Sequence, residues 1–136
     1  MTKEAYCSLE VAKLLKEKEF LQDVNPRMIQ NLSYYDNIGL CHNLSKYYDS
    51  LIQDKIDFII APTHQMACAW LREKHNILIS IIPQEVKVGV SKLCYAIYRI
   101  AKDVYIPLYN GYINNLVDPY EDAVEAALKY SLENLL

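Results

Sequence analysis

The chain has 136 residues, a formal net charge of −3, 52% hydrophobic residues and 23% charged residues. This composition excludes a disordered chain and is typical of one folded domain spanning residues 1–136. Its lysines and arginines form no basic cluster of the kind that phosphate contacts require, so we expect no binding to nucleic acid.

The sequence also predicts where the protein works. No apolar run approaches the roughly 20 residues needed to cross a bilayer, and the first residues lack the apolar stretch of a signal peptide. We therefore expect a cytoplasmic protein without membrane contacts. The four cysteines are irregularly spaced, which in a reducing compartment indicates thiols rather than disulfides; they are Cys7, Cys41, Cys68 and Cys94.

The first predicted helix follows Ser8, a favourable N-cap, and ends near Glu19. Glu10 lies in its first turn, where the helix dipole favours an acidic side chain. Its apolar face is formed by Val11, Ala12, Leu14 and Leu15.

Residues 23–60 carry weaker signals. Residues 28–35 are interpreted as a strand, residues 36–39 as a turn, and residues 44–52 as a short helix with Asn43 as its cap. Residues 56–60 form a short apolar run that leads to the next helix.

The second predicted helix begins around Pro62 and Thr63, because proline suits a first helical turn. Its apolar residues recur at helical spacing and are expected in the core, namely Met66, Ala67, Trp70 and Leu71. The charged residues 72–74 close this helix before His75.

Strands are predicted between the second and third helices. Residues 77–82 are apolar on both faces, which favours a central strand ending at Pro83. Residues 92–102 form a second strand, and residues 105–109 form a third strand that Pro107 places at an edge. Asn110 and Gly111 favour a two-residue hairpin turn, from which residues 112–116 would return.

The third predicted helix has Asp118 as N-cap, Pro119 at the first helical position and Glu121 two residues later, and it runs to the C-terminus. Strands grouped between helices favour an α+β fold over a parallel α/β fold. We predict an antiparallel sheet of about three to five strands, with three main helices mostly on one face. The expected core includes Leu15, Trp70, Leu71, Ile79 and Leu128.

Three blocks of the sequence resemble a group of small uncharacterised proteins of gut bacteria and of their phages and mobile elements. They are residues 8–18, residues 61–76 with Ala-Pro-Thr-x-Gln-Met-Ala-x-x-Trp-Leu-Arg-Glu, and residues 120–136 with Tyr-Glu-x-Ala-Val-Glu-Ala-Ala-Leu-Lys-Tyr-x-Leu-Glu-Asn. The resemblance covers the three helices and little of residues 23–60 and 84–117. It implies a small accessory protein of prophage or mobile-element origin, and it brings no activity or functional residues.

Candidate chemistry is sparse, and each candidate has a structural explanation. Cys68 follows His64 by one helical turn, so the two form a possible nucleophile and base, but a buried thiol is the more common case. Cys41 and His42 invite a zinc site with distant partners among Cys7, Cys94 and His75, yet the paired spacing of zinc ligands is missing. We expect no metal and no cofactor.

Two groups of carboxylates were considered for acid–base chemistry, one of Asp54 and Asp57 and the other of Glu121, Asp122 and Glu125. The first group borders a turn, and the second crowds a helix start, where acidic residues favour the dipole. We therefore expect both groups to be solvated. The three glycines are too far apart for a phosphate-binding loop.

The 12 tyrosines are the one unusual feature of the composition. Tyrosine is enriched at protein interfaces, although it is also common in partly buried sheets. The candidate interaction surface consists of Tyr34, Tyr35, Tyr47, Tyr48, Tyr105 and Tyr109. We expect a non-enzymatic protein that binds a protein partner or a second copy of itself, through a face rather than a strand edge. The alternative is an enzyme whose site is assembled from scattered residues.

Overall fold

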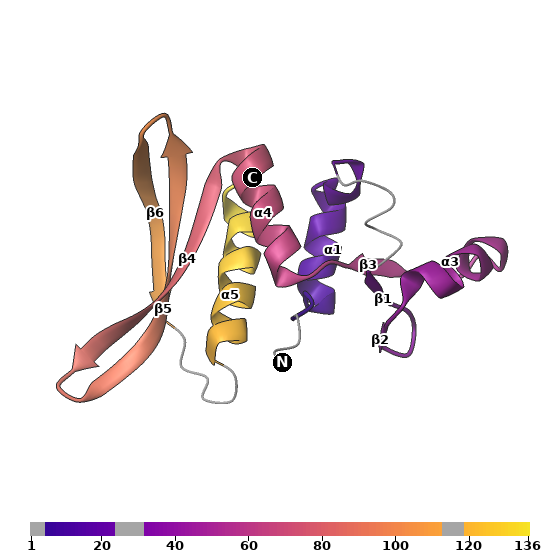
Figure 1. Ribbon diagram of the computed structural model, residues 1–136, viewed down its shortest axis with the longest axis horizontal. Coiled ribbons are helices and arrows are strands. Elements are labelled where there is room, and N and C mark those ends of the chain that lie inside the picture. Colours follow the sequence, from indigo (N-terminus) through magenta and orange to yellow (C-terminus); the bar gives the residue numbers. More distant parts are fainter. Residues whose placement is uncertain (1–4, 24–31, 113–118) are drawn as a thin grey trace. The chain divides into compact units, whose positions relative to one another are not determined.

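The computed structural model (Figure 1) describes residues 5–23, 32–112 and 119–136. Its contacts divide the chain into two compact units, residues 1–66 and residues 67–136, and each unit is described by itself. The predicted α+β class and antiparallel pairing are confirmed. The described strands form two separate sheets of three strands, one in each unit.

Unit 1 begins with α1 (Leu9–Glu17), whose start agrees with the sequence prediction. The Ser8 hydroxyl accepts a hydrogen bond from the Val11 N–H at 3.2 Å and so caps the helix. The apolar face of α1 buries Val11, Ala12 and Leu15. Glu19 has a φ of 64° and turns the chain into η1 (Phe20–Gln22), which buries Phe20.

The sheet of unit 1 has the order β2-β1-β3 and is built from β1 (Ser33–Tyr35), β2 (Leu40–Cys41) and β3 (Ile59–Ala61). The predicted turn at residues 36–39 joins β1 to β2, and the Asp36 carboxylate accepts from the N–H groups of Ile38 and Gly39. Of the predicted strand 28–35, the structure describes the strand at Ser33–Tyr35, and residues 28–31 lie outside the described residues.

The helix predicted at residues 44–52 is α3 (Leu44–Gln53). Asn43 is the N-cap residue as predicted, but it adopts a left-handed φ of 68°, and its side chain makes no capping hydrogen bond. The Leu44 N–H instead donates to the Leu32 carbonyl at 2.9 Å. Tyr34, Leu44 and Leu51 form the buried cluster between α3 and the sheet.

The helix α4 (His64–His75) starts two residues later than the first predicted residue, Pro62. The Thr63 hydroxyl accepts from the Met66 N–H at 3.2 Å, so Thr63 is the cap and Pro62 precedes the helix. The unit boundary falls within α4, after Met66. In unit 2, the helix buries Ala67, Trp70 and Leu71 as predicted.

The sheet of unit 2 has the order β4-β5-β6, with β4 (Ile77–Lys87), β5 (Val90–Ala101) and β6 (Val104–Tyr112). Two sequence predictions were wrong here. The strand from Ile77 is an edge strand rather than the central one, and it continues past Pro83, which pairs with Leu93. An edge strand tolerates proline because only one side of its backbone is paired.

The predicted hairpin turn at Asn110 and Gly111 is also wrong. Both residues continue β6, where Asn110 pairs with Ala96 and Gly111 with Tyr95. The described turns fall elsewhere: residues 88–89 join β4 to β5, and residues 102–103 join β5 to β6. Tyr112 is the last residue of β6, and residues 113–116 of the predicted return strand lie outside the described residues.

One face of this sheet packs against α5 (Pro119–Asn134), which contacts β5 and β4 (Figure 1). The Tyr109 ring stacks on that of Tyr130 of α5, with centroids 3.8 Å apart. Tyr95 and Ile97 lie on the same face and are buried. We call this side of the sheet the inner face. The predicted core residue Ile79 also lies here, but it is half-buried because β4 is an edge strand; Leu15, Trp70, Leu71 and Leu128 are buried as predicted.

Gly111 is required by the packing of the inner face. The Tyr95 ring lies directly over it, and a Cβ atom at position 111 would overlap that ring. We expect Gly111→Ala to lower the free energy of unfolding by about 1–3 kcal/mol, because overfilling a packed site forces side chains from their preferred rotamers. Asn110→Ala, at the neighbouring exposed position, should leave it nearly unchanged.

A double-mutant cycle by urea denaturation separates this cause from a general effect on the strand. With Tyr95 already replaced by alanine, the additional cost of Gly111→Ala should largely disappear. A cost that is the same in both backgrounds would show that the Tyr95 ring is not the reason for the glycine.

Candidate functional site

The side of the unit 2 sheet that faces away from α5 is largely apolar, and we call it the outer face. Strand pairing places directly opposed residues on the same face, so the register assigns its members, and those with described side chains are Leu78, Ser80, Ile82, Cys94, Ala96, Tyr98, Ile100, Tyr105, Pro107 and Asn110. Within unit 2, Figure 1 shows the described helices on the inner side of the sheet.

The outer face is largely apolar, and none of its described side chains is charged. Tyr105 is 61% exposed and Ile82 is 42% exposed, and Pro107 is exposed as well. The rings of Tyr98 and Tyr105 contact each other edge to face, with centroids 6.5 Å apart. Tyr105 and Pro107 are neighbours on this face, beside Tyr98, whereas Ile82 pairs with Cys94 further along the sheet. Neighbouring exposed apolar side chains are typical of interaction surfaces, whereas single exposed apolar residues are common everywhere.

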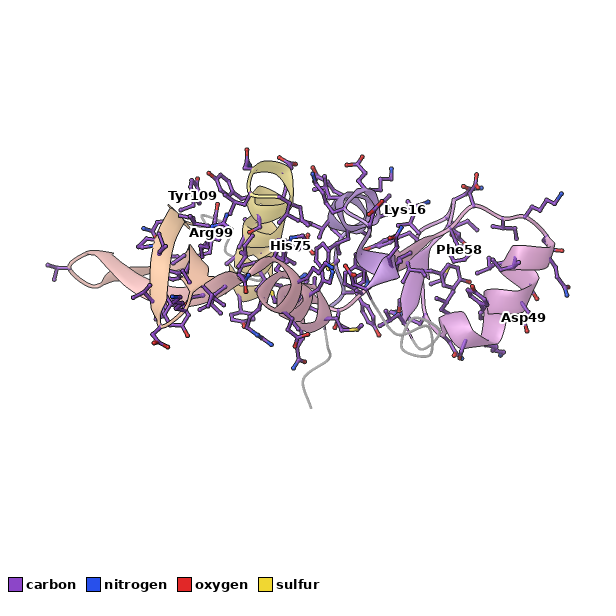
Figure 2. The ribbon with its side chains drawn as sticks, turned by 90° about the horizontal axis from the view of Figure 1, so that it is seen from above. Lys16, Asp49, Phe58, His75, Arg99 and Tyr109 are labelled. Carbon is purple, nitrogen blue, oxygen red and sulfur yellow. The ribbon has the colours of Figure 1, made fainter. Side chains whose placement is uncertain are left out.

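The six tyrosines chosen from the sequence lie in different environments. In unit 1, Tyr34 is buried, and the Tyr35 hydroxyl donates to the Cys7 carbonyl at 2.8 Å. On α3 of the same unit, Tyr47 is 44% exposed and Tyr48 is half-buried. In unit 2, Tyr105 belongs to the outer face and Tyr109, labelled in Figure 2, to the inner face.

Sequence reasoning missed most of the outer face, including Leu78, Ile82, Tyr98 and Ile100. The available signal was the alternation along residues 77–82 and 97–101, where every second residue belongs to one face. That signal was obscured because the inner positions of residues 77–82 are all isoleucine, so both faces of this strand are apolar.

Cys68 does not have the properties of an activated nucleophile. Burial raises the pKa of its thiol to about 11, although the Arg72 guanidinium acts in the opposite direction. The thiol is therefore protonated at neutral pH, whereas a nucleophilic cysteine requires the thiolate. His64 is buried, with 9% of its surface exposed.

Cys41 and His42 interact with other partners in unit 1. The Cys41 Sγ donates to an Asp36 carboxylate oxygen at 3.4 Å, and burial together with that carboxylate raises the pKa of this thiol. The His42 Nδ1 lies 2.7 Å from the Ser33 Oγ. This serine–histidine pair has the spacing of a catalytic pair, but Ser33 is only 1% exposed, so a substrate cannot reach its hydroxyl.

The prediction that both groups of carboxylates are solvated holds for one of the two groups. Asp54 and Asp57 are exposed, whereas Glu121, Asp122 and Glu125 are half-buried on α5. One Asp122 oxygen is buried without a hydrogen-bond partner among the described residues. Because the residues directly before α5 lie outside the description, this oxygen supports no assignment of chemistry.

No protein-family model, curated protein or solved structure matches this chain. The resemblance of the three helical blocks to small proteins of gut bacteria and their phages therefore stays a prediction. Within the residues that the structure describes, no helix has the length and hydrophobicity that a membrane crossing requires.

The Cys68 thiol makes stability depend on pH in a defined direction. Its pKa is about 11 in the folded chain and near 9 when the thiol is solvated, so the folded state holds the proton more tightly. This contribution to stability is fully present below pH 9 and is lost as the pH rises towards 11. Relative to Cys68→Ala, the protein should lose about 2–3 kcal/mol of unfolding free energy over that interval.

The measurement is urea denaturation of both proteins at a series of pH values. Tyrosine titration affects both alike, so the difference between the two free energies reports on Cys68. A difference that stays constant between pH 8.5 and 11 would contradict the assigned burial of the thiol.

Proposed function

We propose that the protein is a non-enzymatic interaction protein that associates with a second copy of itself through the outer face. The observation that supports the proposal is the set of exposed and half-buried apolar side chains on this face, led by Tyr105 and Ile82. Tyrosine adds large, rigid and amphipathic contact area at low entropic cost, which suits an interface.

The absence of charge on the described part of the outer face favours a second copy as the partner. Two-fold dimers are the commonest homo-oligomers, and their interface joins the same patch on both chains. A charged patch placed against itself would bring like charges together at a cost of several kcal/mol. The described outer face carries no such penalty, whereas a partner recognised by charge would find no complementary group on it.

The contact is proposed between faces rather than between strand edges. β6 is an edge strand of the sheet, and a free edge can pair with another chain. Pro107 lies in the middle of this edge and has no N–H to donate, so a continuous intermolecular sheet would lack a hydrogen bond there. Stacking of the outer faces needs no backbone pairing.

An enzyme remains the alternative class, and no described arrangement favours a particular reaction. The serine–histidine pair has a buried hydroxyl, and the thiol pKa values of Cys41 and Cys68 are raised. If the resemblance of the helical blocks is correct, the interaction protein would be an accessory protein encoded by a prophage or mobile element.

Sedimentation velocity over a wide range of concentrations tests the proposal. We expect the mass to rise above the 15.8 kDa of one chain as concentration increases. Tyr105→Glu should weaken association at least about tenfold, because it would place a charge in an apolar contact. Tyr105 is exposed, so the variant should fold, which circular dichroism would verify.

Val104→Glu is the matched control. Val104 neighbours Tyr105 on β6, is 59% exposed and belongs to the opposite face of the sheet. The Val104→Glu variant should leave association unchanged. A constant mass of 15.8 kDa at all concentrations would contradict self-association, and equal effects of both variants would contradict the assigned face.

A further inference from the structure

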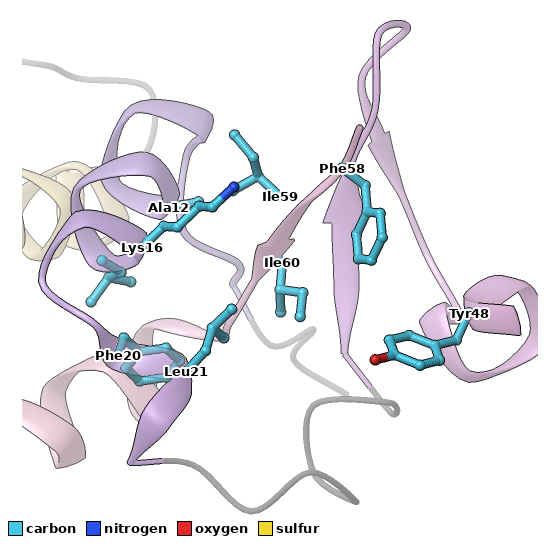
Figure 3. A pocket seen from close by; sticks show the side chains of 9 residues that line it. Ala12, Lys16, Phe20, Leu21, Tyr48, Phe58, Ile59 and Ile60 are labelled. Carbon is cyan, nitrogen blue, oxygen red and sulfur yellow. The ribbon is translucent and has the colours of Figure 1, made fainter. Parts of the chain in front are cut away.

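Unit 1 contains a small apolar pocket that the sequence did not indicate (Figure 3). It has a volume of about 210 Å³ and is lined by Ala12, Leu15, Lys16, Phe20, Leu21, Tyr48, Phe58, Ile59 and Ile60. The lining comes from α1, η1, β3 with the residue before it, and α3. Ala12, Leu15 and Phe20 are buried and belong to the core, while Tyr48, Phe58 and Ile60 are half-buried and form walls.

The pocket is lined by residues from both faces of β3, which is a short edge strand. β3 is at the edge of its sheet, and Ile59 and Ile60 point to opposite faces of it. Ile60 packs against the cluster of α3, and both residues also line the pocket. Two edge-to-face contacts hold the Phe58 ring, one with Tyr34 at 6.0 Å and one with Tyr48 at 6.3 Å between centroids. These contacts orient one wall of the pocket.

The volume restricts the size of an occupant. An apolar cavity of about 150 Å³ accommodates benzene, whereas drug-sized ligands occupy pockets of about 300–1,000 Å³. A pocket of about 210 Å³ therefore has room for one ring or a branched chain of similar size with a short extension. Its aromatic and branched aliphatic walls suit such an apolar group.

The polar atoms at the pocket indicate which polar group a ligand would carry. Of the nine lining residues, Lys16 alone is charged, and Figure 3 shows its nitrogen beside Ile59. No carboxylate of the described residues lies within ion-pair distance of that ammonium group. In the same view, the Tyr48 hydroxyl points towards Ile60, so a donor is available from another wall.

We propose that this pocket binds small apolar carboxylates, with the ring or branched chain against its apolar walls and the carboxylate at Lys16. The apolar part provides the affinity, because the walls remove it from water. The carboxylate pairs with an exposed ammonium group and stays partly hydrated, so the ion pair contributes selectivity rather than most of the affinity. This site lies in unit 1 and is independent of the proposed self-association.

Phenylacetate and its neutral analogue phenylacetamide are suitable probes, because they share the ring and differ in charge. Titration of the isotopically labelled full chain, followed by nuclear magnetic resonance, should shift the signals of the lining residues. We expect Lys16→Gln to weaken phenylacetate binding about two- to fivefold, as an exposed ion pair predicts, without affecting phenylacetamide. Lys13→Gln, on the exposed side of the same helix, is the matched control and should affect neither.

Three results would overturn the proposal. The first is that phenylacetate does not shift the lining residues. The second is that Lys16→Gln weakens both probes equally, and the third is that Lys13→Gln has the same effect as Lys16→Gln. Neither lysine is buried, so each variant should keep the fold, and unchanged signals of core residues of unit 1 that do not line the pocket, such as Cys7, would verify this.

Discussion

The packing of one helix against one face of a three-stranded sheet determines the surface of unit 2. β5 pairs on both sides, with β4 and with β6, and α5 packs on the inner face through Tyr130 and its buried alanines and leucines, leaving Val104 and Ile106 of that face exposed. A sheet has two faces, and the sequence places apolar residues on both. The outer face therefore presents apolar side chains beyond those that α5 can bury, and the proposed self-association follows from this imbalance.

A single irregularity in the pairing decides which tyrosines reach the outer face. Tyr105 and Tyr109 are four residues apart, so a regular strand would place them on the same face. The register shifts between Ile97 and Tyr98, which sends Tyr105 to the outer face and Tyr109 to the helix. A bulge reverses the alternation in this way. The sequence prediction grouped both tyrosines in one surface because no residue pattern marked the shift.

The local signals in the sequence were sufficient for most helices and for one turn. Ser8, Thr63 and Asp36 act through hydrogen bonds to backbone N–H groups a few residues away, and such short-range chemistry is readable without the fold. Asn110 and Gly111 carry an equally strong local signal, but tertiary packing overrides it, because the Tyr95 ring occupies the space above the glycine. Strand order and the apolar pocket depend on distant segments, so the sequence alone could not reveal them.

The two units offer different kinds of recognition, and each can be tested without reference to the other. In unit 1, a small, partly open pocket with one ammonium group suits a small molecule, since its volume is below that of pockets for drug-sized ligands. In unit 2, an open face without described charges suits a broad protein contact. The difference follows from the two sheets. In unit 1, helices lie near the short edge strand β3, whereas in unit 2 the long strands β4 and β5 extend beyond the helix that packs on them.

The central claim, that the outer face is the surface of self-association, is tested most directly by recording backbone and side-chain resonances of the full chain as a function of its own concentration. We expect progressive shifts or broadening at Leu78, Tyr98, Ile100 and Tyr105, with the signals of Tyr109 and Tyr130 on the helical side changing far less. Spectra that are independent of concentration, or changes confined to the inner face and α5, would contradict it.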